Sequence, residues 1–457
     1  MATTNLRVAL ISEHASPLAR QGGVDSGGQN VYVLHVATAL ARHGHQVDVF
    51  TRRDLAGLPR TVRLGSGVRV VHIDAGPPEY VPKERLLPFM PAFGTDMLRF
   101  MRRTHRYDVV HANFFMSGLV GLRLQRQLHL PLVQTFHALG AVRRLHQKAM
   151  DTFPAERIAL ERQIACAADC VIAECPQDAE DLMRHCGAPA ERIAQVPCGV
   201  DFAEFGPGDR GVARRRLGLD EHEFIVLQLG RLVPRKGVDN VIRAVARLPP
   251  GTPWRLLVVG GESVVPDERK TPEIGRLRAV AREAGVEARV DFVGRRDRDQ
   301  LRDYYQAADV FVTTPWYEPF GITPLESMAC GTPVIGAAVG GIQHTVVDGM
   351  TGYLVPPHDP EALAQRLDEL RRSPRLARIM GRAGRARVHR EFTWDIVAQR
   401  LAQLYAQLAG RPRTGAPARP RPAVSAVPPV PAVSTVQAAQ AASGGGDFAR
   451  PGLGLEG

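Results

Sequence analysis

The sequence predicts an α/β protein built from two doubly wound parallel sheets, and three observations lead to that fold class. The chain has 457 residues, too long for one ordinary hydrophobic core and suited to two domains of roughly 200 residues each. Short β-branched apolar runs alternate with longer helical patterns, which is typical of parallel strand–helix–strand units. The alternation starts afresh at Phe224–Gly230, so a second sheet is expected to follow the first.

The first half contains apolar runs that are predicted to form strands, with helices between most of them. The predicted helices include Gln29–His43, Phe93–Arg106 and Glu156–Ala167. The predicted strands are Arg7–Ser12, Gln46–Thr51, Val68–Ile73, Asp108–Ala112, Leu132–Phe136, Cys170–Ala173 and Ile193–Val196.

The second half repeats the pattern and sets the expected domain boundaries. The strand Phe224–Gly230 leads into the predicted helix Val238–Arg247, and a last helix is predicted over Asp395–Ala409. The other predicted strands are Arg255–Val259, Val290–Val293, Val310–Thr313, Pro333–Gly336 and Gly352–Val355. We expect an N-terminal domain over residues 1–205, a C-terminal domain over 206–391, a helical segment over 392–410 that packs back toward the N-terminal domain, and a disordered tail over 411–457.

Composition and charge exclude several classes of protein. No apolar run of about 18 residues occurs, which argues against a membrane span, and the N-terminus lacks the features of a signal peptide, so a cytoplasmic protein is expected. The six cysteines form no Cys-x-x-Cys pair and are expected to be free thiols. The net charge of +11 comes largely from arginines interspersed with acidic residues. We therefore expect no nucleic-acid partner, and at most weak contact with an anionic membrane.

A glycine-rich segment, Gly22–Asn30, separates the first strand from the first helix. Glycines allow the backbone to turn tightly and to approach a ligand closely, and the start of the following helix offers free N–H groups to a phosphate. The alternative is a simple strand–helix turn. The glycine spacing differs from that of the dinucleotide-binding fingerprint.

Two cations, Arg231 and Lys236, follow the strand Phe224–Gly230 on a loop that precedes a helix. At the carboxyl end of a sheet strand, such cations can hold a diphosphate and stabilise its charge as it departs. The alternative is an ordinary basic surface loop.

Two glutamates, Glu318 and Glu326, flank a turn that follows the strand Val310–Thr313. A helix is predicted to begin near Ile322, which places Glu318 on the loop and Glu326 about one turn into the helix. One carboxylate could accept hydrogen bonds from a sugar and the other from a ribose, with helix N–H groups facing phosphate between them. The alternative is a capping acid followed by a solvated one.

Two histidines lie near the carboxyl ends of predicted neighbouring strands in the first domain. His137 follows Leu132–Phe136 closely enough to hydrogen-bond a reacting sugar, and His111 has an equivalent place on Asp108–Ala112. A purely structural histidine is the alternative for both. No Asp-x-Asp pair or His/Cys cluster has the spacing of a metal site, so no metal is expected.

In this order and spacing, the four motifs resemble those of the retaining glycosyltransferases of family four, which have the GT-B fold of two Rossmann-like domains with a cleft between them. The resemblance covers about Leu6 to Ala409. Within the family, Asp25–Tyr32 and Tyr107–His111 look most like the inositol-phosphate glycosyltransferases and the sucrose-phosphate synthase group.

The resemblance implies a role for each motif residue, and it implies no cofactor. Catalysis would depend on His137, Arg231, Lys236 and Glu318. The donor would be bound by Arg231 and Lys236 at the diphosphate with Gly23 nearby, by Glu326 at the ribose, and by Glu318, Phe320 and Gly321 at the sugar.

For the acceptor, the resemblance implies binding by Gly28, Asn30, Lys83, His111 and Arg157. Lys83 and Arg157 match positions that bind the acceptor phosphate in the inositol-phosphate enzymes. The sequence departs from that pattern at Phe114, where those enzymes have an aromatic hydroxyl, and at Ala138, where they have a hydroxyl residue. Each missing donor would weaken a phosphate site by about 1–3 kcal/mol, while Lys83 and Arg157 still favour an anionic acceptor.

The resulting hypothesis is a retaining, metal-independent hexosyltransferase. It would use a nucleotide-diphosphate sugar, with uridine favoured by the resemblance, and a small, phosphorylated polyol or sugar as acceptor. The residues alone leave open the base, the hexose, the acceptor and the oligomeric state. The alternatives are a transferase acting on a lipid-linked or polysaccharide acceptor at a membrane surface, a GT-B epimerase, and a non-catalytic nucleotide-sugar-binding protein.

Overall fold

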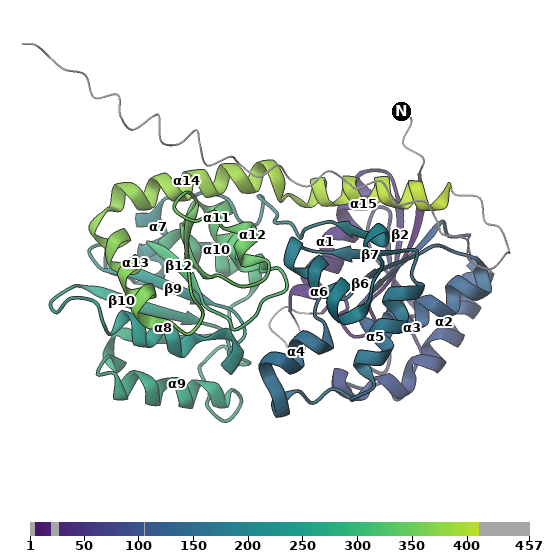
Figure 1. The fold of residues 1–457 in the computed structure, drawn as a ribbon, viewed down its shortest axis with the longest axis horizontal. Coiled ribbons are helices and arrows are strands. Elements are labelled where there is room, and N and C mark those ends of the chain that lie inside the picture. The colour runs from purple at the N-terminus through teal and green to yellow at the C-terminus, as the bar shows by residue number, and fades with distance from the viewer. Residues whose placement is uncertain (1–4, 20–26, 105, 411–457) are drawn as a thin grey trace, which may run out of the picture.

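The structure is a computed structural model that describes residues 5–19, 27–104 and 106–410. Within them the chain forms two α/β domains side by side, and the last two helices run along one side of both (Figure 1). The expected disordered tail, residues 411–457, and Gly23 lie outside the described residues.

The N-terminal domain has an eight-stranded sheet in the order β3-β4-β2-β1-β5-β6-β7-β8. All neighbouring strands are parallel except β3, which pairs antiparallel with β4. The chain reverses its direction of winding between β1 and β5, so the topological switch point lies there. The strands are β1 (Arg7–Ile11), β2 (Gln46–Arg52), β3 (Thr61–Gly65), β4 (Val68–Ile73), β5 (Val109–Asn113), β6 (Leu132–Thr135), β7 (Cys170–Ala173) and β8 (Ile193–Gln195).

Helices cover both faces of this sheet, as its nearly continuous apolar strands require. The α-helices are α1 (Gly28–Arg42), α2 (Met90–Thr104), α3 (Phe115–Leu128), α4 (Gly140–Gln147), α5 (Arg157–Ala167) and α6 (Pro176–Cys186). Short 3₁₀ turns are η1 (Lys83–Arg85), η2 (Leu87–Phe89), η3 (Lys148–Met150) and η4 (Ala190–Arg192).

The C-terminal domain has a six-stranded, wholly parallel sheet in the order β11-β10-β9-β12-β13-β14, with its switch point between β9 and β12. The strands are β9 (Phe224–Leu229), β10 (Trp254–Val259), β11 (Val290–Gly294), β12 (Val310–Thr313), β13 (Val334–Ala337) and β14 (Gly352–Val355). The helices are α7 (Arg210–Leu217), η5 (Pro234–Lys236), α8 (Val238–Val245), α9 (Pro272–Glu283), η6 (Glu287–Arg289), α10 (Arg298–Ala307), α11 (Ile322–Cys330), α12 (Ile342–Thr345), α13 (Pro360–Arg372), α14 (Pro374–Glu391) and α15 (Trp394–Ala409).

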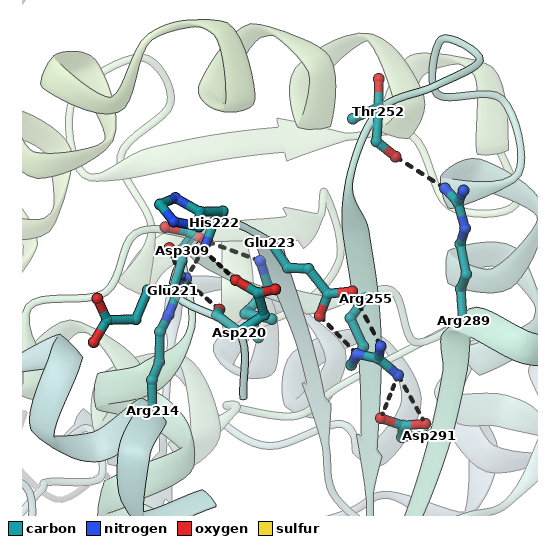
Figure 2. A network of polar contacts seen from close by, with 11 residues as sticks. Arg214, Asp220, Glu221, His222, Glu223, Thr252, Arg255, Arg289, Asp291 and Asp309 are labelled. Atoms are coloured by element: carbon teal, nitrogen blue, oxygen red, sulfur yellow. Dashed lines mark hydrogen bonds and ion pairs between the residues drawn. The ribbon is translucent and has the colours of Figure 1, made fainter. Parts of the chain in front are cut away.

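Polar contacts tie the amino-terminal ends of the C-terminal strands together (Figure 2). Arg255 on β10 donates to Glu223, just before β9, at 2.7 Å and to Asp291 on β11 at 3.1 Å. Arg214 on α7 donates to Asp309, just before β12, at 2.6 Å. These arginines form a structural ion-pair network that connects neighbouring elements of the C-terminal domain.

Every predicted strand is present, with each end within one residue of its expected position. The sequence analysis did not predict β3, for a physical reason. Its residues Thr61–Gly65 are alternately exposed and half-buried, because the strand lies at the edge of the sheet. Such a strand lacks the apolar run by which the others are found.

The chain crosses between the domains twice, and the two crossings contact each other. The backbone N–H of Val200 donates to the carbonyl of Phe392 at 2.8 Å. Gly199 allows this close approach, because a Cβ there would lie 2.8 Å from the backbone nitrogen of Trp394. After the second crossing, α15 packs against α1 and β5 of the N-terminal domain. The two crossings thus lie side by side as one connection between the domains, which is called the hinge below.

Candidate active site

The carboxyl ends of both sheets border one cavity of about 470 Å³ between the domains. Its walls come from the loops after β1, β5, β6 and β7 on one side, and after β9, β10, β11 and β12 on the other. Both topological switch points therefore open into the same space, which is where a doubly wound sheet binds its ligands.

A cluster of charged side chains occupies the C-terminal wall. The Lys236 Nζ forms an ion pair with Oε2 of Glu318. Burial alone would raise the pKa of the Glu318 carboxyl, but Lys236, Arg235 and Arg231 together hold it below its ordinary value. Burial lowers the pKa of Lys236 despite this partner. Three cations thus surround one carboxylate, and the excess of positive charge suits a diphosphate.

Close backbone packing holds the two loops of this cluster together. Gly237, with φ +64°, approaches so closely that a Cβ would lie 2.0 Å from the carbonyl oxygen of Thr314. The N–H of Trp316 donates to the carbonyl of Arg235 at 2.9 Å. These contacts fix the backbone on both sides of Lys236, and the ion pair with Glu318 then positions its ammonium group.

The helix α11 begins at this cluster. Gly321, at φ +89°, turns the chain into the helix, and Pro324 lies in its first turn, where no N–H is required. Phe320, Gly321, Ile322 and Thr323 all line the cavity. The free N–H groups and positive dipole end of α11 therefore lie where the cations lie.

Glu326, one turn further along α11, lines the cavity but is already paired. Its Oε1 accepts from Arg298 at 2.8 Å, and its Oε2 accepts from the hydroxyl of Tyr305 at 2.9 Å. Arg298 also donates to Glu204, in the crossing between the domains, at 2.5 Å. Each carboxylate oxygen keeps a second lone pair that can accept a further hydrogen bond, and the same network connects this position to the hinge.

On the N-terminal wall, His137 lies at the cavity with both ring nitrogens close to oxygen atoms. Its Nδ1 is 3.0 Å from Oε1 of Glu174, and its Nε2 is 2.9 Å from Oδ1 of Asn113. His137 has φ +60°, a conformation that is costly for a residue other than glycine and that clusters at functional sites. Asn113, His137 and Glu174 come from the carboxyl ends of β5, β6 and β7.

His111 does not reach the cavity, which corrects its expected role in acceptor binding. The side chain is fully buried, its Nδ1 lies 2.6 Å from the hydroxyl of Tyr405, and its Nε2 lies 2.8 Å from the hydroxyl of Thr135. Burial, and to a smaller degree His137, lower the pKa of His111 to about 3. It is a neutral core residue beneath the site.

Arg157 also lies behind the wall, and direct contact with an acceptor phosphate does not fit its place. It pairs with Glu161 at 2.7 Å and donates to the carbonyl of Ala138. The rings of Phe114 and Phe153 lie 4.8 and 4.5 Å from its guanidinium carbon. The pair supports the loop after β6 from behind, because Glu161 also accepts from the backbone N–H of Gly140 at 2.8 Å.

The other expected acceptor residues do line the cavity. Gly28 and Asn30 lie at the start of α1, and Lys83 lies on η1. The Asn30 amide is engaged locally, since its Oδ1 accepts from Gly27 and its Nδ2 donates to the carbonyl of Ser16, both at 3.0 Å.

The comparisons with known proteins follow the same division of the chain. Residues 26–204 match the family model described as Glycosyltransferase Family 4, and residues 209–387 match the model described as Glycosyl transferases group 1. A protein named D-inositol 3-phosphate glycosyltransferase from Acidothermus cellulolyticus is 39% identical over 424 residues, which are 91% of this chain and 93% of that protein. The chain belongs to glycosyltransferase family four.

Two further relatives of this glycosyltransferase support the assignment. A D-inositol 3-phosphate glycosyltransferase from Actinosynnema mirum is 40% identical over 410 residues, 88% of this chain and 97% of that one. The solved structure of sucrose-phosphate synthase from Thermosynechococcus elongatus is 37% identical, with a TM-score of 0.81 over 88% of this chain and 99% of that chain. The GT-B fold is thereby confirmed.

Sequence reasoning missed several residues of the glycosyltransferase cavity. Glu174 lines the cavity, and Asn113 is fully buried behind it, where it contacts His137. His14, after β1, lines the cavity with its Nδ1 2.7 Å from Oε1 of Glu13. Arg143 on α4 lines it as a cation that also pairs with Asp151 at 3.0 Å. A usable signal was their place within two residues of the end of a predicted strand, which holds for all but Arg143.

Among the residues that the structure describes, no helix of this glycosyltransferase has both the length and the apolar character needed to cross a bilayer.

Proposed function

We propose that this enzyme transfers a hexose from a nucleotide-diphosphate sugar, with uridine diphosphate as the first carrier to test, to a small anionic acceptor with retention of the donor's α configuration. The observation that carries the proposal is the Lys236–Glu318 pair. It lies with Arg231 at the start of α11 and lines the same cavity as His137.

In the proposed reaction the bond between the anomeric carbon and the diphosphate oxygen breaks, and the acceptor oxygen bonds to that carbon on the same face. The proton of the acceptor hydroxyl passes to the departing phosphate. Arg231, Lys236 and the N–H groups of α11 stabilise the charge that develops on the diphosphate. When the diphosphate takes the ammonium group of Lys236, Glu318 is free to accept hydrogen bonds from the sugar. Closure about the hinge aligns the two substrates and excludes water.

For the acceptor, we propose that Lys83 and Arg143 attract an anionic group. Both cations line the N-terminal part of the cavity, whereas Arg157 is enclosed by aromatic rings behind the wall. The names of the inositol-phosphate relatives support a phosphorylated polyol. Phe114 and Ala138 contribute no hydroxyl there, so charge rather than hydroxyl hydrogen bonding would hold the phosphate.

The proposed chemistry depends on protein cations and needs no metal ion. Among the described residues, one group of three possible ligands lies close together, namely His35, Asp201 and Glu204, with ligand atoms within 4.8 Å of one another. This group lies at the hinge, and Arg298 already donates to Glu204 there. A second cation beside that guanidinium would be repelled. Turnover that persists in a strong chelator would support metal independence.

The test begins with purified protein and a panel of uridine, guanosine and adenosine diphosphate hexoses, with donor hydrolysis as the readout. Acceptors then follow as matched pairs, a polyol and its phosphate, and the anomeric configuration of the product is read by NMR. Lys236→Met is expected to lower turnover at least about a hundredfold. The matched control is Lys270→Met, because Lys270 is exposed. Equal loss in both variants, or loss in neither, would contradict the site.

A lipid-linked acceptor at a membrane surface is the second candidate, and one observation favours it. Leu145 and Met150, on α4 and η3 beside the cavity wall, are 62% and 57% exposed. Two exposed cations are close to them in the sequence, Arg144 just before Leu145 and Lys148 at the start of η3. Apolar and basic groups together suit an anionic membrane surface. Flotation of the protein with anionic vesicles, lost in a Leu145→Ser/Met150→Ser variant, would support this acceptor class. Recovery of the unmodified protein wholly in solution would argue against it.

A further inference from the structure

Three side chains at the ends of adjacent parallel strands contact one another at the cavity, where His137 and Glu174 line the wall and Asn113 lies behind it. Asn113 ends β5, His137 follows β6, and Glu174 follows β7 directly. The imidazole ring lies between the other two side chains, at 2.9 Å from Asn113 Oδ1 and 3.0 Å from Glu174 Oε1. Asn113 and Glu174 are themselves buried.

The partners of His137 can accept hydrogen bonds but cannot donate them. The amide of Asn113 has a fixed orientation, because its Nδ2 donates to the carbonyl of Ile11 at 3.2 Å and a carbonyl can only accept. Its Oδ1 must therefore face the ring. An ionised Glu174 is likewise acceptor-only. Two acceptors opposite the two ring nitrogens are satisfied only when both nitrogens carry hydrogen.

His111, on the neighbouring strand of the same sheet, has the kind of partners that a neutral histidine ring can satisfy. His111 faces the hydroxyls of Tyr405 and Thr135, each of which can donate or accept. A neutral ring satisfies both of those bonds, in agreement with the full burial of His111. His137 has no hydroxyl among its ring partners, so a neutral ring would leave two acceptors facing each other.

A thiol and a second carboxyl lie beside Glu174. Burial, and then Glu174 itself, raise the pKa of the Cys198 thiol well above its ordinary value, so the thiol stays protonated and donates to Oε1 of Glu174 at 3.3 Å. The same two causes raise the pKa of Asp178 to about 8. The ring of Tyr32, on α1, packs against the imidazole of His137 in a T-shaped arrangement, with 4.8 Å between the ring centroids.

We propose that Glu174 and Asn113 are positioning residues that hold the His137 ring doubly protonated beside the donor sugar. This inference rests on the proposed function. A ring without a lone pair cannot take the proton of the acceptor hydroxyl. As the acceptor oxygen bonds to the anomeric carbon and the diphosphate oxygen leaves, that proton therefore goes to the departing phosphate, and the imidazolium adds positive charge to that side of the cavity.

The experiment compares the full-length protein with its Glu174→Gln variant. The amide keeps an acceptor oxygen at nearly the same place but removes the negative charge. The ring of His137 is observed by NMR in ¹⁵N-histidine protein, and a His137→Gln variant assigns its signals. At about pH 7.5 we expect both nitrogens protonated in the wild type and one in the variant. Donor turnover is measured in parallel across pH.

In the variant we expect kcat to fall by about 10- to 100-fold, with the donor KM changed less than about threefold. Its kcat should recover as the pH is lowered, because the ring regains its second proton, whereas wild-type kcat should not rise. Asp178→Asn is the control. It replaces a nearby carboxyl with an amide, and its ring signals and kcat should match the wild type.

Two results would overturn the inference: a wild-type ring with one protonated nitrogen at about pH 7.5, or a Glu174→Gln variant with wild-type kcat and pH profile. If Glu174→Gln does not fold, the wild-type spectrum alone decides. If the wild type turns over no nucleotide sugar, the proposed function fails, while the spectrum still reports the state of the ring.

Discussion

Asp178 offers a change whose effect on stability can be worked out from the structure. This residue lies in the first turn of α6, and its Oδ2 accepts from the backbone N–H of Glu174 at 2.9 Å. Burial, followed by the charge of Glu174, raises the pKa of the Asp178 carboxyl to about 8. The folded protein therefore holds this proton over a range of pH in which the unfolded chain releases it.

The direction and size of the effect of pH on stability follow from proton linkage. The ordinary pKa of the group is 3.8, so between that value and about pH 8 the folded state binds more protons than the unfolded state. The free energy of unfolding then falls by about 1.4 kcal/mol for each unit of rising pH. The stability that Asp178 gains from binding this proton is fully present below its ordinary pKa. It is lost as the pH rises toward and through the pKa of the folded state. By pH 7 the free energy of unfolding has fallen by about 4 kcal/mol, and about 3 kcal/mol of this fall occurs above pH 5.

An asparagine in place of this aspartate cannot ionise and still presents a carbonyl oxygen to the N–H of Glu174. We expect Asp178→Asn to raise the melting temperature at pH 7 by roughly 5–10 °C, with a smaller difference at pH 5. The assay is thermal unfolding of both proteins, followed by circular dichroism at several pH values. A difference in melting temperature that does not change with pH, or a variant less stable than the wild type at pH 7, would refute the reasoning.

Three further changes test the cavity. Glu326→Gln keeps the hydrogen-bonding shape but removes the charge expected at the ribose, so kcat/KM for the donor should fall about 10- to 100-fold; an unchanged value would remove Glu326 from the donor site. Arg298→Met removes the arginine that the carboxylates of Glu326 and Glu204 share. It should destabilise the protein by about 3 kcal/mol, discounted because Glu204 is partly exposed. A melting temperature equal to that of the wild type would contradict it. Phe114→Tyr combined with Ala138→Ser adds two hydroxyls to the acceptor wall. It should lower the KM for a phosphorylated polyol about tenfold, and an unchanged KM would show that the phosphate binds elsewhere.

Much of the fold was predictable because buried parallel strands are apolar throughout. Strands such as Cys170–Ala173 and Val310–Thr313 have no polar face and are bounded by helical patterns, so their limits can be read directly. The edge strand Thr61–Gly65 has no such run, because only its pairing with β4 makes it a strand.

The site was predictable where function depends on place along a strand. Arg231, Lys236 and Glu318 follow strands of the C-terminal sheet, and they meet in the cavity because the carboxyl ends of parallel strands share one edge. These assignments as donor-binding and catalytic residues remain predictions until activity is measured.

The sequence analysis failed where side-chain partners decide the role. The predicted strand ended at Ala112, which put His111 near the rim, but β5 continues to Asn113, and the His111 ring is fully buried against the hydroxyls of Tyr405 and Thr135. Arg157 was assigned to the acceptor by resemblance alone. Its pairing with Glu161, one helical turn later, and the rings that enclose it depend on tertiary packing.

The path of the chain also has a consequence for synthesis. The first domain to leave the ribosome is not finished until the last helix arrives, because α15 covers α1 and β5, and Tyr405 contacts His111 at 2.6 Å. Until then the apolar surface that receives Leu401, Leu404 and Leu408 is open to water. A nascent chain that stops after the second sheet should therefore have two sheets and one incomplete domain, and it should be a better target for chaperones than the full-length protein.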